Sequence, residues 1–192
     1  MSHAQTIILL VDTSSSMSVE HIDLQFNSYE RALRELPYLE RVNFEVILFN
    51  ESPDQIAKQA HRLTAADAFA NLERLPGEYR GSTCMGKALT YVELIIEFLP
   101  PPVILDISGD GEANCEGRDG IPDSLNRLAA QGVRINTLVV NEGHEIYGDL
   151  SPVTEYQSLT RNGGFTIVAD SFADFEQAIF EKLTMELAQL NE

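Results

Sequence analysis

Short apolar runs alternate along the chain with longer segments in which apolar residues recur every three or four positions. A continuous apolar run is typical of a strand covered on both faces, and the longer spacing is typical of a helix with one buried stripe. The alternation therefore predicts βα repeats over a mostly parallel sheet, in a single domain of residues 1–192 without a linker or an internal repeat. The expected strands are residues 6–12, 41–49, 55–61, 103–108, 133–140 and 166–169.

The helical spacing predicts about as many helices as strands, and capping or breaking residues indicate where they begin and end. Pro37 is expected to stop the first helix, Thr64 with Asp67 to cap the second, and Ser171 with Asp174 to cap the last. The expected helices are residues 19–36, 64–75, 85–98, 121–131, 151–163 and 171–190.

One strand is expected to run against the others. A turn at residues 50–54 separates the strand at 41–49 from a weaker strand at 55–61, and this spacing suits an antiparallel hairpin at the edge of the sheet. The predicted fold class is therefore α/β: a three-layer, doubly wound, Rossmann-like and mostly parallel six-stranded sheet with one antiparallel edge strand.

The charge balance excludes several kinds of partner. The 192 residues include 13 Lys and Arg against 30 Asp and Glu, a net charge of −17. Phosphate backbones and anionic lipids are bound mainly by Lys and Arg, so neither nucleic acid nor a membrane surface is expected as a partner. The apolar runs are also far shorter than the ~20 residues that span a bilayer, so membrane insertion is not expected.

The first residues bear on the compartment. Residues 1–5 are too short and too polar to form a secretory signal. The expected location is therefore cytoplasmic if Met1 is the native start, with a periplasmic or secreted protein whose signal peptide has been removed as the alternative.

The strongest chemical motif follows the first strand directly. Asp12, Ser14 and Ser16 form a DxSxS arrangement in the segment DTSSSM. One carboxylate and two hydroxyls at alternate positions supply oxygen ligands for a hard cation such as Mg²⁺ or Ca²⁺, whereas thiolate and imidazole, which would suggest zinc, are missing from the motif. The alternative is that these serines are ordinary loop and N-cap residues before a helix.

A second acidic loop follows the strand at residues 103–108, in the segment VILDISGDG. In open α/β sheets, ligands bind outside the carboxyl ends of the strands where the winding reverses, so two such loops side by side would define a site. Asp110 is the expected second carboxylate, because a glycine on each side lets the backbone turn it toward a ligand. Asp106 is the rival, but it lies within the strand, where local pairing would explain it.

These residues resemble the von Willebrand factor A-type (vWA) domain with its metal-ion-dependent adhesion site (MIDAS), in a little-characterised bacterial branch of unknown function. DTSSSM matches the DxSxS motif of the family, and Thr83 in GSTCMGKAL matches its loop threonine. The segments SGDGEAN, RINTLVV and DFEQAIFEKLTMEL extend the resemblance over essentially the whole chain. The resemblance implies the strand order 3-2-1-4-5-6, which places Asp12 and Asp110 on the strands that flank the switch point.

The resemblance also implies a ligand set for Mg²⁺, with Mn²⁺ or Ca²⁺ as alternatives. Ser14 and Ser16 would bind the ion directly, Asp12 and Asp110 mostly through water, and Thr83 in either way. The sixth position would be left for an Asp or Glu of a protein partner, which gains a strong charge interaction because the hydroxyl ligands are neutral. The chain departs from the family at Asp110, where SGDG stands in place of TDG.

The two cysteines are expected at the same edge as the metal loops. Cys84 follows Thr83, and Cys115 lies five residues after Asp110. One interpretation is that both are buried, reduced thiols. The other is a disulfide that joins the two loops, which requires the two Cα atoms to lie within ~7 Å of each other. A disulfide would indicate an oxidising compartment.

The expected function is a non-catalytic module that binds an acidic residue of a protein partner through a divalent cation. The sequence has no GxSxG motif, no Cys/His pair in a recognisable context and no paired-carboxylate site beyond the metal loops, so the protein is not expected to be an enzyme. One alternative is an intracellular scaffold or adaptor subunit that works with an AAA-type ATPase, as some relatives of this domain do. The other is a metal-dependent hydrolase that uses the same carboxylates.

Overall fold

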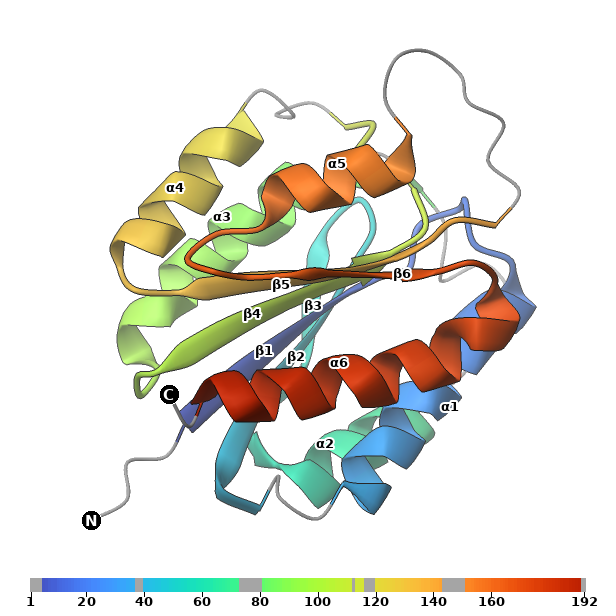
Figure 1. Ribbon diagram of the computed structural model, residues 1–192, viewed down its shortest axis with the longest axis horizontal. Helices are drawn as coiled ribbons and strands as arrows, with labels where there is room; N and C mark the ends of the chain where they lie inside the picture. Colours follow the sequence, from blue (N-terminus) through green and yellow to red (C-terminus); the bar gives the residue numbers. More distant parts are fainter. Residues whose placement is uncertain are drawn as a thin grey trace.

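The computed structural model describes residues 5–36, 40–72, 81–111, 113–115, 120–142 and 151–190. Within them, a six-stranded sheet lies between two layers of helices (Figure 1). The strand order is β3-β2-β1-β4-β5-β6, and among these strands only β2 and β3 pair antiparallel. The predicted three-layer α/β fold, its strand order and its antiparallel edge strand are confirmed.

The strands follow the apolar runs of the sequence to within two residues at either end. Seven of the eight positions of β1 are buried, because this strand lies between β2 and β4 with helices over both faces. The strands are β1 (Gln5–Asp12), β2 (Val42–Phe49), β3 (Pro53–His61), β4 (Val103–Gly109), β5 (Arg134–Val140) and β6 (Thr166–Ala169).

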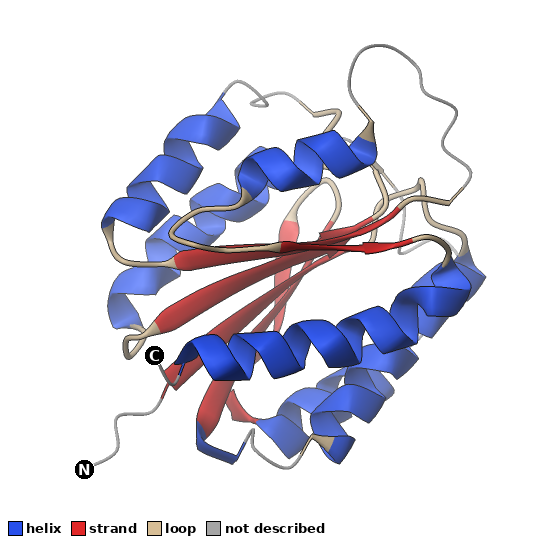
Figure 2. Cartoon of the chain, in the orientation of Figure 1, coloured by secondary structure: helices blue, strands red, loops and turns tan. Residues whose placement is uncertain are grey.

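The helices cover the sheet from both sides, as Figure 2 shows in blue against the red strands. They are α1 (Val19–Glu35), α2 (Arg62–Ala70), α3 (Met85–Ile95), α4 (Ile121–Ala130), α5 (Pro152–Leu159) and α6 (Phe175–Leu190). Two short 3₁₀ turns accompany them, η2 (Ile96–Phe98) after α3 and η4 (Phe172–Asp174) before α6. None of the helices in the described part of the chain has the length and apolar character needed to cross a membrane.

Two predicted helix starts are wrong. The second helix begins at Arg62 rather than after Thr64, because β3 runs directly into it and His61 accepts the capping hydrogen bond from the Leu63 amide at 3.4 Å. Before the last helix, the Ser171 hydroxyl donates to Asp174 at 2.7 Å, and a 3₁₀ turn forms there instead of the first turn of α6. The expected end of the second helix near residue 75 is also wrong, because α2 ends at Ala70 with Asn71 as its C-cap. α1 ends at Glu35, one residue before its expected end, and Pro37 lies outside the described residues.

The sheet separates two hydrophobic cores. One core lies under α1, α2 and α6 and the other under α3, α4 and α5 (Figure 1). Alternate residues of β1 enter opposite cores: Ile7 and Leu9 pack toward α1, and Ile8 and Leu10 toward α3. This alternation is the two-residue period of a strand. Because β1 and β4 pair in parallel, the loops that follow them both lie at the carboxyl edge of the sheet.

Candidate metal-binding site

Three loops meet at the carboxyl edge of the central strands. β1 ends at Asp12, β4 ends at Gly109, and the two strands pair in parallel, so the loops that follow them lie side by side. A third segment, residues 81–84, enters the same edge just before α3, where the Ser15 amide and hydroxyl both donate to the Gly81 carbonyl at 3.0 Å. These loops carry the predicted ligands Asp12, Ser14, Ser16, Thr83 and Asp110.

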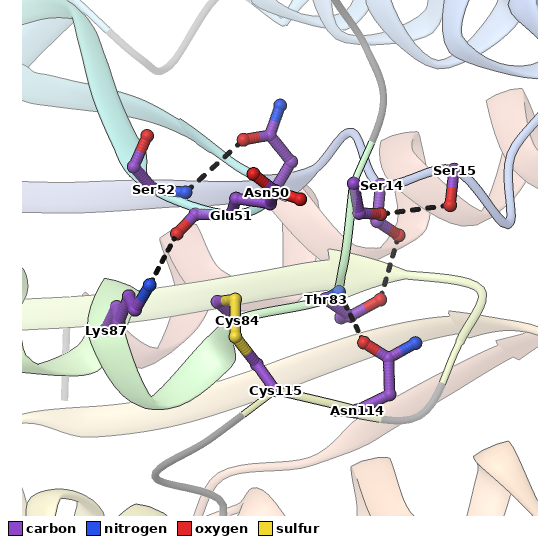
Figure 3. The surroundings of a disulfide bond; sticks show 11 residues. Ser14, Ser15, Asn50, Glu51, Ser52, Thr83, Cys84, Lys87, Asn114 and Cys115 are labelled. Atoms are coloured by element: carbon purple, nitrogen blue, oxygen red, sulfur yellow. Dashed lines mark hydrogen bonds between the residues drawn. A yellow bond between two sulfur atoms is a disulfide. The ribbon is translucent and has the colours of Figure 1, made fainter.

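Four of the five predicted ligands form one continuous chain of side-chain hydrogen bonds. Thr83 Oγ1 donates to Ser14 Oγ at 2.9 Å (Figure 3), and Ser14 Oγ lies 3.0 Å from Ser16 Oγ. Ser16 Oγ in turn donates to Asp110 Oδ1 at 2.7 Å. In an octahedron with metal–oxygen distances near 2.1 Å, adjacent ligand oxygens are roughly 3 Å apart. The oxygen spacing along this chain therefore suits neighbouring ligands of a small cation.

Asp12 is a buried carboxylate whose charge is incompletely balanced. Its Oδ1 accepts a hydrogen bond from the Ser14 amide at 2.8 Å, but its Oδ2 is buried and has no hydrogen-bond partner among the described residues. Burial raises the pKa of Asp12 to about 7; the Ser14 amide opposes this shift and the nearby charge of Asp110 adds to it. A cation at this position would supply the countercharge that the carboxylate lacks.

Gly109 makes room for a second buried polar group beside Asp12. A Cβ atom at position 109 would collide with the Tyr156 hydroxyl and would lie 2.8 Å from the Asp12 Cβ. The Tyr156 hydroxyl, which α5 brings to this place, is buried and has no hydrogen-bond partner among the described residues. Neither Gly109 nor Gly111 has a positive φ, so neither adopts the left-handed conformation that favours glycine. At Gly109 the missing side chain serves close packing instead.

The loop that carries Thr83 is tied to the loop that follows β4. The Thr83 amide donates to Asn114 Oδ1 at 2.8 Å, and the Asn114 amide donates to the Thr83 carbonyl at 3.3 Å. Next to this pair, a disulfide joins Cys84 to Cys115, with Cα atoms 4.9 Å apart (Figure 3). The structure thus contains the disulfide and not the two reduced thiols. Sequence reasoning missed Asn114, although a short amide side chain beside a cysteine in a ligand loop was a signal for it.

Asp106, the rival carboxylate, lies outside this site. It faces away from the loops toward α6, where its Oδ1 contacts Lys182 Nζ, and both side chains are fully buried. Lys182 Nζ also lies 3.8 Å from Glu186, whose Oε1 accepts a hydrogen bond from Asn136 Nδ2 at 3.1 Å. Burial lowers the pKa of Lys182 to about 8 and Glu186 opposes this shift, so the ammonium is still charged at neutral pH. Asp106 is paired, but with a distant helix rather than locally.

The donor set of the site determines which ion it suits. No group of three or more His, Cys, Asp or Glu residues that could hold a metal occurs in the described ranges. The predicted ligands are two carboxylates and three hydroxyls. Such oxygen ligands suit Mg²⁺, Mn²⁺ or Ca²⁺. Together with the buried, unpartnered Asp12 oxygen, the residues present fit a hard divalent cation.

The doubly wound sheet and its strand order define a vWA-type fold. The chain itself belongs to the family described as "Protein of unknown function (DUF1194)", whose model matches residues 54–191. The DxSxS segment precedes the matched region. No protein with a curated description matches the chain.

Several solved structures share the fold at low sequence identity. Proximal thread matrix protein 1 from the mussel byssus superposes with a TM-score of 0.75 at 17% identity, over 97% of this chain and 48% of that chain. The von Willebrand factor type A structure from Catenulispora acidiphila gives 0.73 at 15% identity, over 96% and 43%. The protein thus spans about half the length of these two relatives. BatB from Bacteroides thetaiotaomicron gives 0.68 at 16% identity, over 96% and 99%.

The mussel protein has also been solved with a zinc-occupied MIDAS motif, in a structure that matches this chain with a TM-score of 0.72 at 16% identity. At such identities the comparison establishes the shared fold. The occupied motif is a property of the mussel protein.

Proposed function

We propose that this protein is a non-catalytic binding module that holds a divalent cation and captures through it an Asp or Glu of a protein partner. The observation that carries the proposal is the buried Asp12 Oδ2, which has no hydrogen-bond partner among the described residues. The other oxygen of this carboxylate accepts from the amide of Ser14, whose hydroxyl belongs to a chain of hydroxyl and carboxylate oxygens from three loops. The zinc-occupied MIDAS motif of the mussel protein supports the proposal, because it places a divalent ion in a protein of the same fold.

The residues have distinct parts in this proposal. The hydroxyls of Ser14, Ser16 and Thr83 would exchange their mutual hydrogen bonds for the cation, and the carboxylates of Asp12 and Asp110 would balance its charge. Mg²⁺ is the expected ion, with Mn²⁺ or Ca²⁺ as alternatives. When bound, the ion supplies positive charge and a coordination position for an incoming carboxylate.

The exposure of the loop indicates where a partner would approach. Ser15 and Ser16 are exposed, whereas Asp12, Ser14, Thr83 and Asp110 are buried, so the set of predicted ligands opens to solvent at Ser16. On a chain with a net charge of −17, a bound cation at this opening would cancel the charge of Asp12 and Asp110 and give a local region with an open coordination position on an otherwise acidic molecule. That region would favour an acidic side chain of a partner.

Metal binding is the first test. Isothermal titration with Mg²⁺ and Mn²⁺ should show one site in the wild-type protein. We expect affinity to fall at least ~100-fold in Asp12→Ala, because both the countercharge and the anchor of the Ser14 amide are lost. Asp54→Ala, which removes an exposed carboxylate on β3, is the matched control and should bind normally. Circular dichroism checks that each variant is folded.

Carboxylate capture is the second test. Bound Mn²⁺ enhances the relaxation of water protons, and a carboxylate that enters the coordination shell displaces water and lowers this enhancement. A short peptide with one Glu should lower it, whereas the same peptide with Gln should not. If the two peptides act alike, the capture of acidic partners is refuted; if wild-type protein binds neither ion, the metal site itself is refuted.

A further inference from the structure

Thr83 differs from the other predicted ligands because it lies just before a helix, whereas they lie at or after the end of β1 or β4. It lies directly before α3, and the N-cap residue of that helix, Cys84, makes no side-chain capping hydrogen bond. The described contacts that hold the segment come from three loops. Ser15 donates twice to the Gly81 carbonyl, the Cys84 amide donates to the Asn50 carbonyl at 2.9 Å, and Thr83 exchanges two hydrogen bonds with Asn114. The position of the Thr83 hydroxyl therefore depends on residues outside its own segment.

The segment that receives Thr83 belongs to the Asp110 loop. Residues 113–115 follow Asp110 closely, and the Ala113 amide donates to the buried carboxylate of Glu155 at 3.2 Å. The disulfide then connects Cys115 to the residue after Thr83. It is a covalent bond between two of the three loops that contribute metal ligands.

The two cysteines differ in exposure. Cys84 is buried, with 1% of its surface exposed, whereas Cys115 is partly exposed. Thiol–disulfide exchange requires a thiolate to reach one sulfur atom, and the exposed side of the bond is the side that a small dithiol can attack. The bond is thus placed where its redox state can change in the folded protein.

We infer that the Cys84–Cys115 disulfide is a redox-sensitive clamp that positions Thr83 against the Asp110 loop and thereby sets the metal affinity of the site. This inference rests on the proposed metal site. Without the covalent bond, the two loops are joined by hydrogen bonds, each of which contributes only modestly to stability in water. In the reduced protein, ordering the two loops would then cost free energy when the metal binds. In the oxidised protein, the disulfide has already ordered them.

The redox step is balanced by an external dithiol. Its two thiols transfer two electrons and two protons, the S–S bond between Cys84 and Cys115 breaks to give two thiols, and the dithiol closes to its own disulfide. Linkage requires reciprocity: if reduction weakens metal binding by some factor, bound metal makes the disulfide harder to reduce by the same factor. We expect this factor to be roughly 10, within the usual range of coupling between sites.

The experiment measures both sides of this linkage on the full chain. Titration with Mg²⁺ should give roughly 10-fold weaker binding for the reduced protein and for Cys84→Ser/Cys115→Ser than for the oxidised protein. Cys84→Ala/Cys115→Ala is a second version that leaves no new hydroxyl at the buried position 84. In a dithiol redox buffer, saturating Mg²⁺ should raise the ratio of oxidised to reduced protein by the same factor, measured by acid trapping of the free thiols.

Asp12→Ala tests whether Mg²⁺ affects the disulfide through the proposed metal site. It retains both cysteines and should show no effect of Mg²⁺ on the redox equilibrium. An effect that persists in this variant would mean that Mg²⁺ acts on the disulfide outside the site, and would overturn the inference.

The remaining outcomes separate the clamp from the metal site. If oxidised and reduced proteins bind Mg²⁺ equally, the clamp is refuted and the proposed function stands. If the oxidised wild-type protein binds no divalent ion, the proposed function fails and the clamp with it. If the reduced protein and both variants are unfolded, the disulfide is required for folding rather than for the site, and the inference is again overturned.

Discussion

Asp12 and Asp106 are two fully buried carboxylates on neighbouring parallel strands, and their surroundings are opposite in charge. Asp106 contacts the ammonium group of Lys182. Asp12 forms no ion pair with any residue in the described ranges, and the charged group that acts on it is the carboxylate of Asp110. A buried charge without a partner is costly. The protein balances the charge of Asp106 itself, whereas Asp12 is left for a cation from solution under the proposed function.

The difference follows from where each residue lies on its strand. Asp106 is in the middle of β4 on the face covered by α6, so a long side chain of that helix can reach it. Asp12 is the last residue of β1, where a loop rather than a helix follows, and its neighbours are short hydroxyl and amide groups. The ammonium group of Lys182 is part of the chain and balances the charge of Asp106. The hydroxyl and amide groups around Asp12 carry no positive charge, so they could only coordinate an ion from solution.

The largest expected effect concerns the Asp106 side of this comparison. Lys182→Met should lower the free energy of unfolding by about 3 to 5 kcal/mol at pH 7, because it leaves Asp106 and Glu186 buried without a positive charge. Urea-induced unfolding measures the change. Lys58→Met, at an exposed position of β3, is the control and should alter stability by less than about 0.5 kcal/mol. A loss below about 1 kcal/mol for Lys182→Met would show that the cluster is not a stabilising pair.

In the presence of a chelator, the free energy of unfolding should depend on pH because the buried charge of Asp12 has no countercharge. The ordinary pKa of this carboxyl is 3.8 and burial raises it to about 7 in the folded protein, so between these values the folded state retains a proton that the unfolded chain has lost. Stability should therefore fall as pH rises through this window, by on the order of 4 kcal/mol in total, and level off above about pH 7. Asp12→Asn should lack this fall; equal pH profiles of the two proteins would contradict the assignment.

Stabilisation by a divalent metal should depend on the carboxylate of Asp12 and not on that of Asp106. At 100 times its dissociation constant, Mg²⁺ should stabilise the wild-type protein by about 2.7 kcal/mol relative to chelator. Asp12→Asn should lose this response, whereas Asp106→Asn should keep it despite a lower starting stability. Chemical unfolding with Mg²⁺ and with EDTA gives both values. A metal response that depends on Asp106 instead would reverse the roles of the two residues.

The smallest expected effect separates two buried tyrosines. Tyr29 donates to Ser108 Oγ at 3.0 Å, whereas the Tyr156 hydroxyl beside Asp12 has no hydrogen-bond partner among the described residues. Tyr29→Phe should cost about 1 kcal/mol, and Tyr156→Phe in chelator should be neutral or slightly stabilising because it removes an unpaired polar group. A cost for Tyr156→Phe as large as that for Tyr29→Phe would mean that its hydroxyl is paired.

The fold could be predicted in most respects from the sequence. The apolar runs predicted β1 and β4 because residues covered on both faces of a central strand must all be apolar. The strand order came from the resemblance carried by DTSSSM and the segments that match with it. The start of α2 was missed because its cap is a histidine at the end of a strand, which is not a usual cap residue.

The candidate site was predictable as a set of residues but not as an arrangement. The DxSxS spacing is local, so Asp12, Ser14 and Ser16 could be recognised together. The structure brings Thr83 and Asp110 to them, while metal binding itself stays a prediction. The packing role of Gly109 was not visible, because it depends on Tyr156, which arrives from another helix.

The sequence by itself determined the strands, most of the helices and the ligand motif, because each follows from the backbone period or from spacing within a few residues. Only the tertiary structure decided that Asp106 is neutralised by Lys182, that Cys84 meets Cys115, and that Asp12 is buried beside Asp110 without a cation from the described chain. The physical reason is that the charge balance of a buried group depends on which distant element packs over it. Strand register and helix packing determine which element that is.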